Sequence, residues 1–262
     1  MFRNMYDTDV TVWSPQGRLL QVEYAGEAVA QGSACVGLTS DTHVVLAALK
    51  RSPHDLASFQ KKLLKIDEHM AIAIAGLNAD ARSLAKYMRT ECLNHKYVYG
   101  TPLQASRLVN DVADKHQRCT QMYVRRPYGV GLLVGSVDAT GPHLYETQPS
   151  GAFFEYTAFG IGQRCQSAKT YLEKHMPSYP GCSKDDLIKH GIKSLTGCVP
   201  ADKQLEASNC GIVVIGPDQK YTLIEGSDLQ VYLDAIELES SAMETKDEEV
   251  KGSEDDDVTM ST

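Results

Sequence analysis

The sequence lacks the paired cysteines of a disulfide framework or a structural zinc site. Its seven cysteines are odd in number and scattered along 262 residues, and none is spaced Cys-x-x-Cys. Cys92 and His95 have a ligand-like spacing on a predicted helix, but no second ligand pair accompanies them. We therefore expect buried thiols in a reducing compartment, with no metal ion and no cofactor.

Long apolar runs and an excess of positive charge are also missing. No run approaches the roughly 20 apolar residues that a membrane-spanning helix needs, and the N-terminus lacks the layout of a secretory signal. The net charge is −8, and residues 237–262 account for all of it with ten acidic residues and two lysines. The preceding 236 residues hold 24 basic and 24 acidic groups. We therefore expect neither nucleic acid nor a membrane as a partner.

The apolar pattern predicts groups of antiparallel strands separated by pairs of helices. Short polar turns separate 34–39 from 43–49 and 63–66 from 70–75, and such short connections permit only antiparallel pairing. Further strands are predicted near 128–137, 143–147, 153–160, 211–215 and 221–225. Apolar residues at helical spacing predict helices around 18–30, 81–92, 101–112, 165–172, 183–195 and 228–238.

Local signals mark a turn and two helix starts. Residues 14–17 (SPQG) predict a turn in which the proline fixes φ and the glycine takes a positive φ. Thr101 and Gln104 are spaced as a capping box. Ser183 is expected to cap a helix, with Asp186 at the third helical position.

This order of elements predicts an α+β fold in which two antiparallel sheets face each other and helices cover both outer faces. Such a four-layer α-β-β-α sandwich buries every predicted apolar face. Strands from early and late segments must interleave, and no linker precedes residue 239, so the body is expected to be one domain.

Two glycine pairs and three basic clusters have simpler explanations than ligand binding. Glycines 129 and 131 lie inside a predicted strand, so close packing is favoured over a dinucleotide fingerprint. Glycines 160 and 162 do lie between a strand and a helix, but no parallel βαβ unit surrounds them. The basic clusters at 50–51, 61–65 and 125–126 are typical of exposed loops and edge strands.

Five segments carry a specific resemblance. Residues 6–18 (YDTDVTVWSPQGR), followed by QVEYA at 21–25 and EAV at 27–29, resemble the N-terminal signature of proteasome alpha subunits. The segments GLNADAR at 76–82 and RPYGV at 126–130 resemble two further motifs of that family. The resemblance covers about residues 1–238, and the opening residues are most similar to one eukaryotic paralogue. It implies the N-terminal nucleophile hydrolase-like fold, which is the sandwich expected above.

The resemblance implies a non-catalytic structural and gating subunit of the 20S core particle, acting in ubiquitin-dependent and other protein degradation. In the family, four residues hold the open conformation of the gate. They correspond here to Tyr6, Asp7, Pro15 and Tyr24, which we call the gate cluster. The tyrosine hydroxyls are expected to bond a neighbour's Asp7. Contacts of about 1 kcal/mol each suit a gate that must switch.

The resemblance also implies partners. Six other alpha subunits complete a heptameric ring, a beta ring lies below it, and regulatory-particle ATPases or other activators bind above. The family's pocket for an activator's C-terminal carboxylate corresponds here to Gly32, Lys62 and Leu77, which we call the carboxylate pocket. The implied localisation is cytoplasm and nucleus.

The alternative is an active hydrolase that uses Ser33. Alignment of the first hairpin places Ser33 at the nucleophile position of the catalytic beta subunits, Leu49 at the carboxylate position and Lys62 at the lysine position. Such enzymes use the amine of a freed N-terminal residue as the base. Here 32 residues precede Ser33 and Leu49 supplies no carboxylate, so we expect no catalytic residue.

The expected organisation has three parts. Residues 1–32 form the gating tail and the pore-side helix, 33–238 the sandwich, and 239–262 an acidic, disordered tail. Within the tail, Ser253 precedes a run of acidic residues and is a predicted phosphorylation site.

Overall fold

Two five-stranded antiparallel sheets form the centre of the protein. The computed structural model describes residues 5–52, 54, 56–200, 204–217 and 219–239. One sheet, called sheet A, has the order β10-β9-β2-β1-β8, and the other, sheet B, has the order β3-β4-β5-β6-β7. The strands of sheet A are β1 (Cys35–Thr39), β2 (Val44–Leu49), β8 (Ala158–Ile161), β9 (Cys210–Ile215) and β10 (Thr222–Ile224). Those of sheet B are β3 (Leu63–Asp67), β4 (Met70–Gly76), β5 (Val130–Asp138), β6 (Gly141–Thr147) and β7 (Phe153–Glu155).

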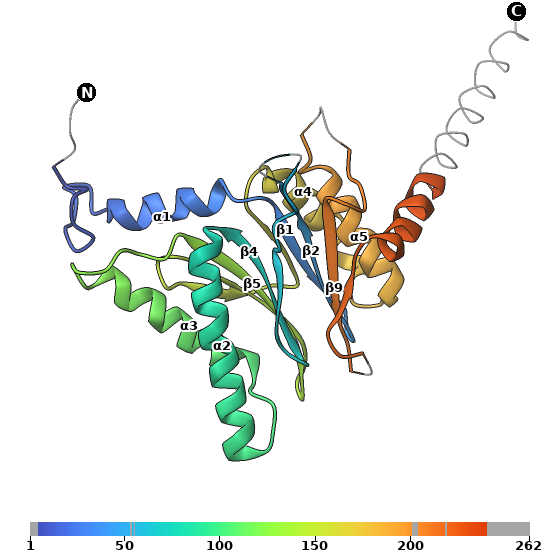
Figure 1. Ribbon diagram of the computed structural model, residues 1–262, viewed down its shortest axis with the longest axis horizontal. Coiled ribbons are helices and arrows are strands. Elements are labelled where there is room, and N and C mark those ends of the chain that lie inside the picture. Colours follow the sequence, from blue (N-terminus) through green and yellow to red (C-terminus); the bar gives the residue numbers. More distant parts are fainter. Residues whose placement is uncertain (1–4, 53, 55, 201–203, 218, 240–262) are drawn as a thin grey trace, which may run out of the picture.

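Helices cover the outer faces of both sheets (Figure 1). They are α2 (Asn78–Tyr99) and α3 (Ala105–Thr120) on sheet B, and α4 (Cys165–His175) and α5 (Lys184–Thr196) on sheet A. Helical residues 227–239 also pack on sheet A, through Leu229 and Leu233. The fold is therefore the expected α-β-β-α sandwich.

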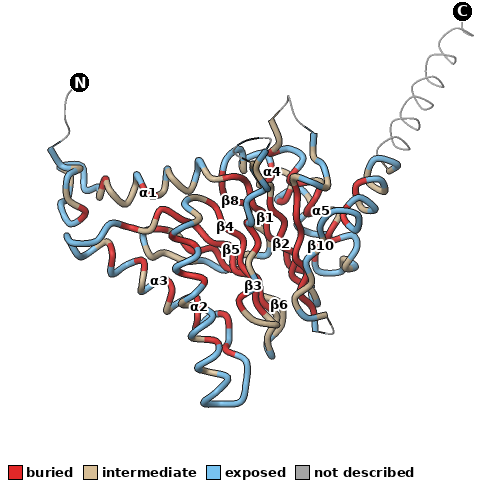
Figure 2. The backbone as a smooth tube through the Cα atoms, viewed as in Figure 1, coloured by how far each residue is buried: buried red, intermediate tan, exposed pale blue. Residues whose placement is uncertain are grey.

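Three apolar clusters lie between the four layers. Figure 2 shows the buried backbone concentrated in the strands, with exposed helix surfaces on both sides. The cluster between the sheets includes Leu46, Leu133 and Leu144. Each outer cluster joins one sheet to its helices, and the strands are consequently buried on both faces, as in the uniformly buried β9.

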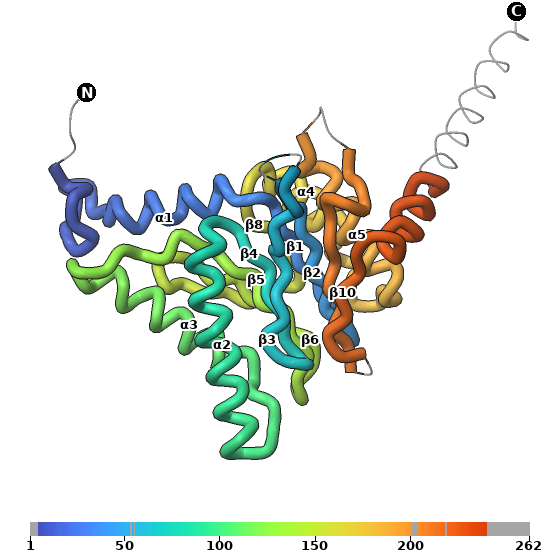
Figure 3. Tube along the Cα trace, viewed as in Figure 1, coloured from blue at the N-terminus to red at the C-terminus, as the bar shows by residue number. Residues whose placement is uncertain are grey.

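The first helix, α1 (Leu20–Ala30), lies outside these four layers and packs on β4 and β5. Figure 3 shows it extending along one end of sheet B. Its close approach depends on glycine. A Cβ atom added at Gly32 would overlap the backbone nitrogen of Gly76 and lie 2.9 Å from the carbonyl carbon of Ala75. A Cβ at Gly131 would lie 2.8 Å from the Val29 side chain. The glycine pair 129 and 131 thus serves packing, as predicted.

Two local predictions were wrong. The predicted strand at 153–160 is two strands, because the chain leaves sheet B after Glu155 and joins sheet A at Ala158. Thr101 does not cap α3, which begins at Ala105 after an extended Gln104. The intervening Leu103 is buried, and its carbonyl accepts a hydrogen bond from His69, so tertiary packing overrides the capping signal.

The predicted cap of α5 is confirmed. The Asp186 amide donates to the Ser183 hydroxyl oxygen at 3.2 Å, and that hydroxyl donates to the Asp186 carboxylate at 2.7 Å. Two acidic residues in the first turn also complement the helix dipole.

Among the described residues, no helix combines the length and apolarity that crossing a membrane requires.

The packing of α1 predicts opposite effects at two glycines. Gly32→Ala should lower the free energy of unfolding by about 2 kcal/mol or more, because backbone atoms surround the added methyl group. Gly26→Ala is the matched control, since nothing lies within 4 Å of its added Cβ. It should stabilise α1 by up to about 1 kcal/mol. Urea denaturation of the full chain measures both, and equal midpoints for the two variants would contradict this account.

Candidate functional site

The segment before α1 is a compact turn with the predicted geometry. The Gly17 amide donates to the Ser14 carbonyl at 2.9 Å, and Gly17 has a φ of 73°. The Ser14 amide donates in turn to the Arg18 carbonyl at 2.9 Å, and Arg18 forms an ion pair with Glu23 of α1. Pro15 lies exposed at the tip of this turn.

Two members of the gate cluster meet within the chain. The Tyr24 hydroxyl donates to the Asp7 carboxylate at 3.3 Å, and the Gln21 side-chain amide donates to the Asp7 carbonyl. Desolvation, followed by the nearby Asp7 carboxylate, raises the pKa of Tyr24. Tyr6 is exposed beside Asp7. The structure thus pairs Tyr24 with Asp7 of its own chain, and the expected contact with a neighbour's Asp7 stays a prediction.

Large apolar side chains are exposed around these contacts, which the sequence pattern did not indicate. The exposed fractions are 79% for Met5, 63% for Trp13 and 46% for Tyr24. Val12 is also exposed, whereas Val10 anchors the segment in a buried position. Apolar groups gathered at a surface are typical of protein–protein contacts.

Ser33 lies where the end of the α1 segment meets sheet A. Its hydroxyl donates to the Leu49 carbonyl, and its own carbonyl accepts from the Lys62 ammonium at 2.7 Å. The Ser33 nitrogen forms the peptide bond to Gly32 and is not an amine. Among the described residues, the Ser33 hydroxyl bonds a backbone carbonyl and no side-chain base, since Lys62 bonds the carbonyl of Ser33 and not its hydroxyl. The arrangement therefore does not activate the serine.

The three residues of the carboxylate pocket are far apart in the sequence but lie close together in space. Gly32 packs against Gly76, which precedes Leu77, and Lys62 bonds the residue that follows Gly32. Leu77 is half exposed, but Lys62 is buried. Desolvation lowers the pKa of the Lys62 ammonium, against the opposing influence of Cys35. Nothing in the sequence pattern indicated this burial, and the role in carboxylate binding stays a prediction.

The two family motifs within the body are joined by an ion pair that the sequence pattern did not predict. The Arg126 guanidinium donates to both Asp80 carboxylate oxygens, at 2.7 and 2.8 Å, and the Gly129 amide donates to the same carboxylate at 3.0 Å. The Leu77 amide also donates to the Gly129 carbonyl at 2.8 Å. These hydrogen bonds, Arg126 foremost, hold the pKa of Asp80 below its usual value. The sequence does place an acidic residue in one motif and an arginine in the other, and this was the signal that could have predicted the ion pair.

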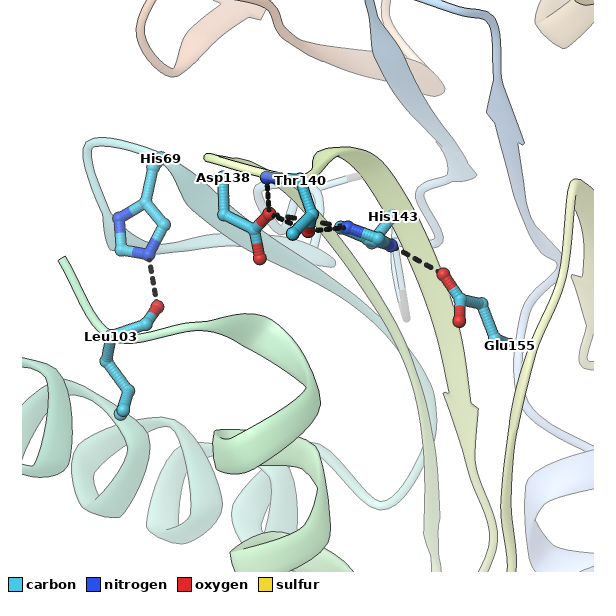
Figure 4. Close-up of polar contacts among 6 residues, drawn as sticks. All are labelled: His69, Leu103, Asp138, Thr140, His143 and Glu155. Carbon is cyan, nitrogen blue, oxygen red and sulfur yellow. Dashed lines mark hydrogen bonds and ion pairs between the residues drawn. The ribbon is translucent and has the colours of Figure 1, made fainter.

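A second polar cluster closes the β5–β6 hairpin (Figure 4). The Asp138 carboxylate accepts from the Thr140 amide at 2.8 Å, and the Thr140 hydroxyl lies 2.7 Å from His143 Nε2. His143 Nδ1 lies 2.5 Å from the Glu155 carboxylate and so joins β6 to β7. The cluster fixes the hairpin turn and the edge strand of sheet B.

Cysteines and histidines form no metal centre in the described part of the chain, where no group of three or more possible ligands occurs. Burial raises the pKa of Cys92 to about 12, and His95 bonds the Thr101 carbonyl at 3.0 Å. Five cysteines are buried, but Cys165 and Cys182 are partly exposed, so the expectation of buried thiols holds only in part. Ser253 and the acidic tail from residue 240 onwards lie outside the described residues, and those predictions stay as stated.

The junction between the two motifs predicts a stability effect. Asp80→Asn should lower the free energy of unfolding by about 2 kcal/mol, because it weakens two charge-assisted hydrogen bonds and one to an amide. Glu68→Gln, in the exposed pair with Lys65, is the control and should cost less than about 1 kcal/mol. Because the pKa of Asp80 is lowered in the folded state, its contribution is present above the unfolded pKa and is lost as the pH falls through the folded pKa. Urea titrations at neutral and acid pH check both points, and equal losses for the two variants would contradict them.

Comparison with known proteins agrees with this geometry. Residues 29–215 match the family model of proteasome subunits, and residues 6–28 match the model of the N-terminal signature of A-type proteasome subunits. The chain is 51% identical over 240 residues to the proteasome alpha type-1 subunit of Dictyostelium discoideum, covering 91% of this chain and 97% of that protein. It is 49% identical over 231 residues to the proteasome alpha type-1 subunit of Drosophila melanogaster, covering 87% and 83%.

A third relative carries another paralogue name. The chain is 51% identical over 236 residues to the probable proteasome alpha type-6 subunit of Schizosaccharomyces pombe, covering 90% of this chain and 87% of that protein. The paralogue that the N-terminus resembles is alpha type-1, the name of the Dictyostelium and Drosophila proteins. The matched signature, the sandwich and these relatives show that the chain belongs to the proteasome subunit family, as an alpha-type structural subunit of the 20S alpha ring.

Proposed function

We propose that this chain is a non-catalytic subunit that controls the access of substrates to the 20S proteasome. Its family implies assembly with other proteasome subunits. In the proposed assembly, six other alpha subunits complete a heptameric ring. A beta ring below supplies the threonine-type peptidase activity, and regulatory-particle ATPases or other activators bind above.

The N-terminal segment carries the gating proposal. It presents exposed apolar side chains at Met5 and Trp13, yet it is held to α1 by hydrogen bonds to Asp7 from Gln21 and Tyr24. A neutral hydrogen bond contributes about 0.5–1.5 kcal/mol and one to a charged group up to about 3 kcal/mol. So few contacts leave a small free-energy difference between the N-terminal segment held on α1 and the segment released from it. The binding of a neighbour or an activator can therefore shift this equilibrium.

The environment of Ser33 supports a non-catalytic role. Its nitrogen lies in a peptide bond, its hydroxyl is engaged by the Leu49 carbonyl, and Leu49 supplies no carboxylate. The alpha-type relatives also weigh against the alternative of a hydrolase that uses Ser33. Reaction with an N-terminal-nucleophile probe at Ser33 would contradict this part of the proposal.

Activator binding is proposed at Gly32, Lys62 and Leu77. Leu77 offers an exposed apolar contact, and Lys62 has donors beyond the one that bonds Ser33. Because Lys62 is buried, its charge would act on a carboxylate at short range with little screening by salt. We also propose that the chain acts in the cytoplasm and nucleus, which imaging of a tagged chain tests.

The gate proposal predicts a loss of activator response. Asp7→Ala and Tyr24→Phe should each lower activator-stimulated peptide hydrolysis by the assembled particle up to about fivefold, the effect of losing about 1 kcal/mol. The other six alpha subunits will reduce this effect. Assembly should be unchanged, because both residues lie at the surface before the sandwich.

Glu27→Gln is the matched control for the gate. It removes one negative charge from an exposed position of α1, and no hydrogen bond or ion pair of its side chain is present in the described structure. Particles with Glu27→Gln should respond like the unmodified particle. Unchanged stimulation in both Asp7→Ala and Tyr24→Phe would remove the gating role from this chain.

The carboxylate pocket predicts a difference between two adjacent lysines. Lys62→Met keeps an apolar stem but removes the charge, and it should lower photo-cross-linking of a C-terminal activator peptide to this chain about tenfold. Lys61→Met changes an exposed position and should have no effect. The amidated form of the peptide should bind both variants equally weakly. Equal cross-linking in Lys62→Met and Lys61→Met would refute the pocket assignment.

A further inference from the structure

A cleft of about 730 Å³ opens beside Ser33 at one end of sheet A. The antiparallel register brings four chain segments to this end: the starts of β1 and β9 and the ends of β2 and β8. Leu77, Gly32 and Lys62 do not line the cleft, and neither does the gate cluster. Its lining therefore differs from that of both sites proposed above, although it adjoins the carboxylate pocket, because Lys62 bonds the Ser33 carbonyl and Gln163 bonds the Gly32 carbonyl. Its volume is in the range of pockets that hold small ligands or short peptide segments.

The wall of the cleft between β8 and α4 is held rigidly. A Cβ at Gly162 would lie 2.6 Å from the Ser33 carbonyl oxygen, so backbone packs on backbone. The Gln163 amide donates to the Gly32 carbonyl at 2.6 Å. Arg164 follows with a φ of 59°, the only positive φ of a non-glycine residue among those described. Such a conformation costs about 1–2 kcal/mol, and strained residues of this kind cluster at functional sites.

Two guanidinium groups give the cleft a positive character. Arg51 donates to the Gln163 side-chain oxygen, a neutral partner, and Arg164 has no ion pair within the described part of the chain. Lys50 differs, since its ammonium lies 2.9 Å from the Glu225 carboxylate. The one acidic side chain in the described lining, Glu206, accepts a hydrogen bond from Ser208. Arg51 and Arg164 are thus available to an anionic ligand.

The remaining lining suits a polypeptide. Gln204 provides a side-chain amide of the kind that pairs with a peptide backbone, and Phe59 provides an apolar surface. Asn209 instead holds the loop, because its side chain bonds the Gln204 carbonyl and the Glu206 amide. Arginine guanidinium groups match the planar geometry of carboxylates. Because the family to which this chain belongs degrades proteins, the extended polypeptide is the occupant that it meets.

We propose that the Ser33 cleft binds acidic segments of extended polypeptides without cleaving them, through Arg51 and Arg164. Binding is non-covalent, because the Ser33 hydroxyl is already engaged by the Leu49 carbonyl. The recognised groups are internal aspartate and glutamate side chains, so a free C-terminus is not required. The proposed peptide would thus lie beside Ser33, the residue that the hairpin alignment places at the nucleophile position of the beta subunits.

The test is photo-cross-linking on the assembled particle with its peptidase sites inhibited. One probe is an acetylated and amidated decapeptide rich in Asp and Glu that carries a benzophenone, and the other has Asn and Gln in their place. At low salt, the acidic probe should label the cleft segments 49–52, 163–164 and 204–209 about tenfold more than the neutral probe. Added salt should reduce this difference.

Two variants decide the role of the arginines. Arg51→Gln keeps a polar side chain, and Arg164→Asn uses a residue that tolerates the left-handed conformation. Together they should lower labelling by the acidic probe about tenfold. Arg125→Gln, an exposed arginine outside the cleft lining, is the control and should change nothing. Normal particle mass and basal peptide hydrolysis establish that the variants assemble.

Three results would overturn the proposal. They are equal labelling of the cleft by both probes, unchanged labelling in the double variant, and acidic-probe labelling that falls only outside the cleft segments. None of these results bears on the gate, because activator stimulation is measured separately. Failure of the gating proposal would likewise leave the cleft labelling as it is.

Discussion

The close approach of backbone at Gly32 and Gly76 joins the N-terminal helix to the sandwich. It seats the end of the α1 segment on sheet B with no room for a side chain between them. The Asp80–Arg126 pair then fixes the chain just before β5, where the Gly129 carbonyl accepts a hydrogen bond from the Leu77 amide. Two sequence motifs far apart in the chain therefore meet the end of the α1 segment at one junction.

That junction also supports the proposed non-catalytic role. The backbone that holds α1 continues through Gly32 into Ser33, so the nitrogen that a catalytic relative would use as a base is part of the peptide link. An intact α1 is thus compatible with the proposed gating role, and it leaves no free amine at Ser33.

Much of this fold could be predicted from the sequence, because hydrophobic spacing reports burial directly. The paired hairpins, the helix pairs and the Ser183 cap are local features and were confirmed. The break at 156–157 was not predicted, since the aromatic-rich, strand-like segment 153–160 does not reveal a change of sheet. Thr101 failed as a cap because Leu103 is held by contacts distant in sequence. The burial of Lys62 and the pairing of Asp80 with Arg126 likewise depend on tertiary packing, which spacing alone does not encode.

Native mass spectrometry of the tagged chain purified from cell extract tests whether the chain is a subunit of the alpha ring. We expect the chain in a complex with six different alpha subunits and the beta subunits, with one copy in each alpha ring. A persistent monomer, or a complex made only of copies of this chain, would contradict it.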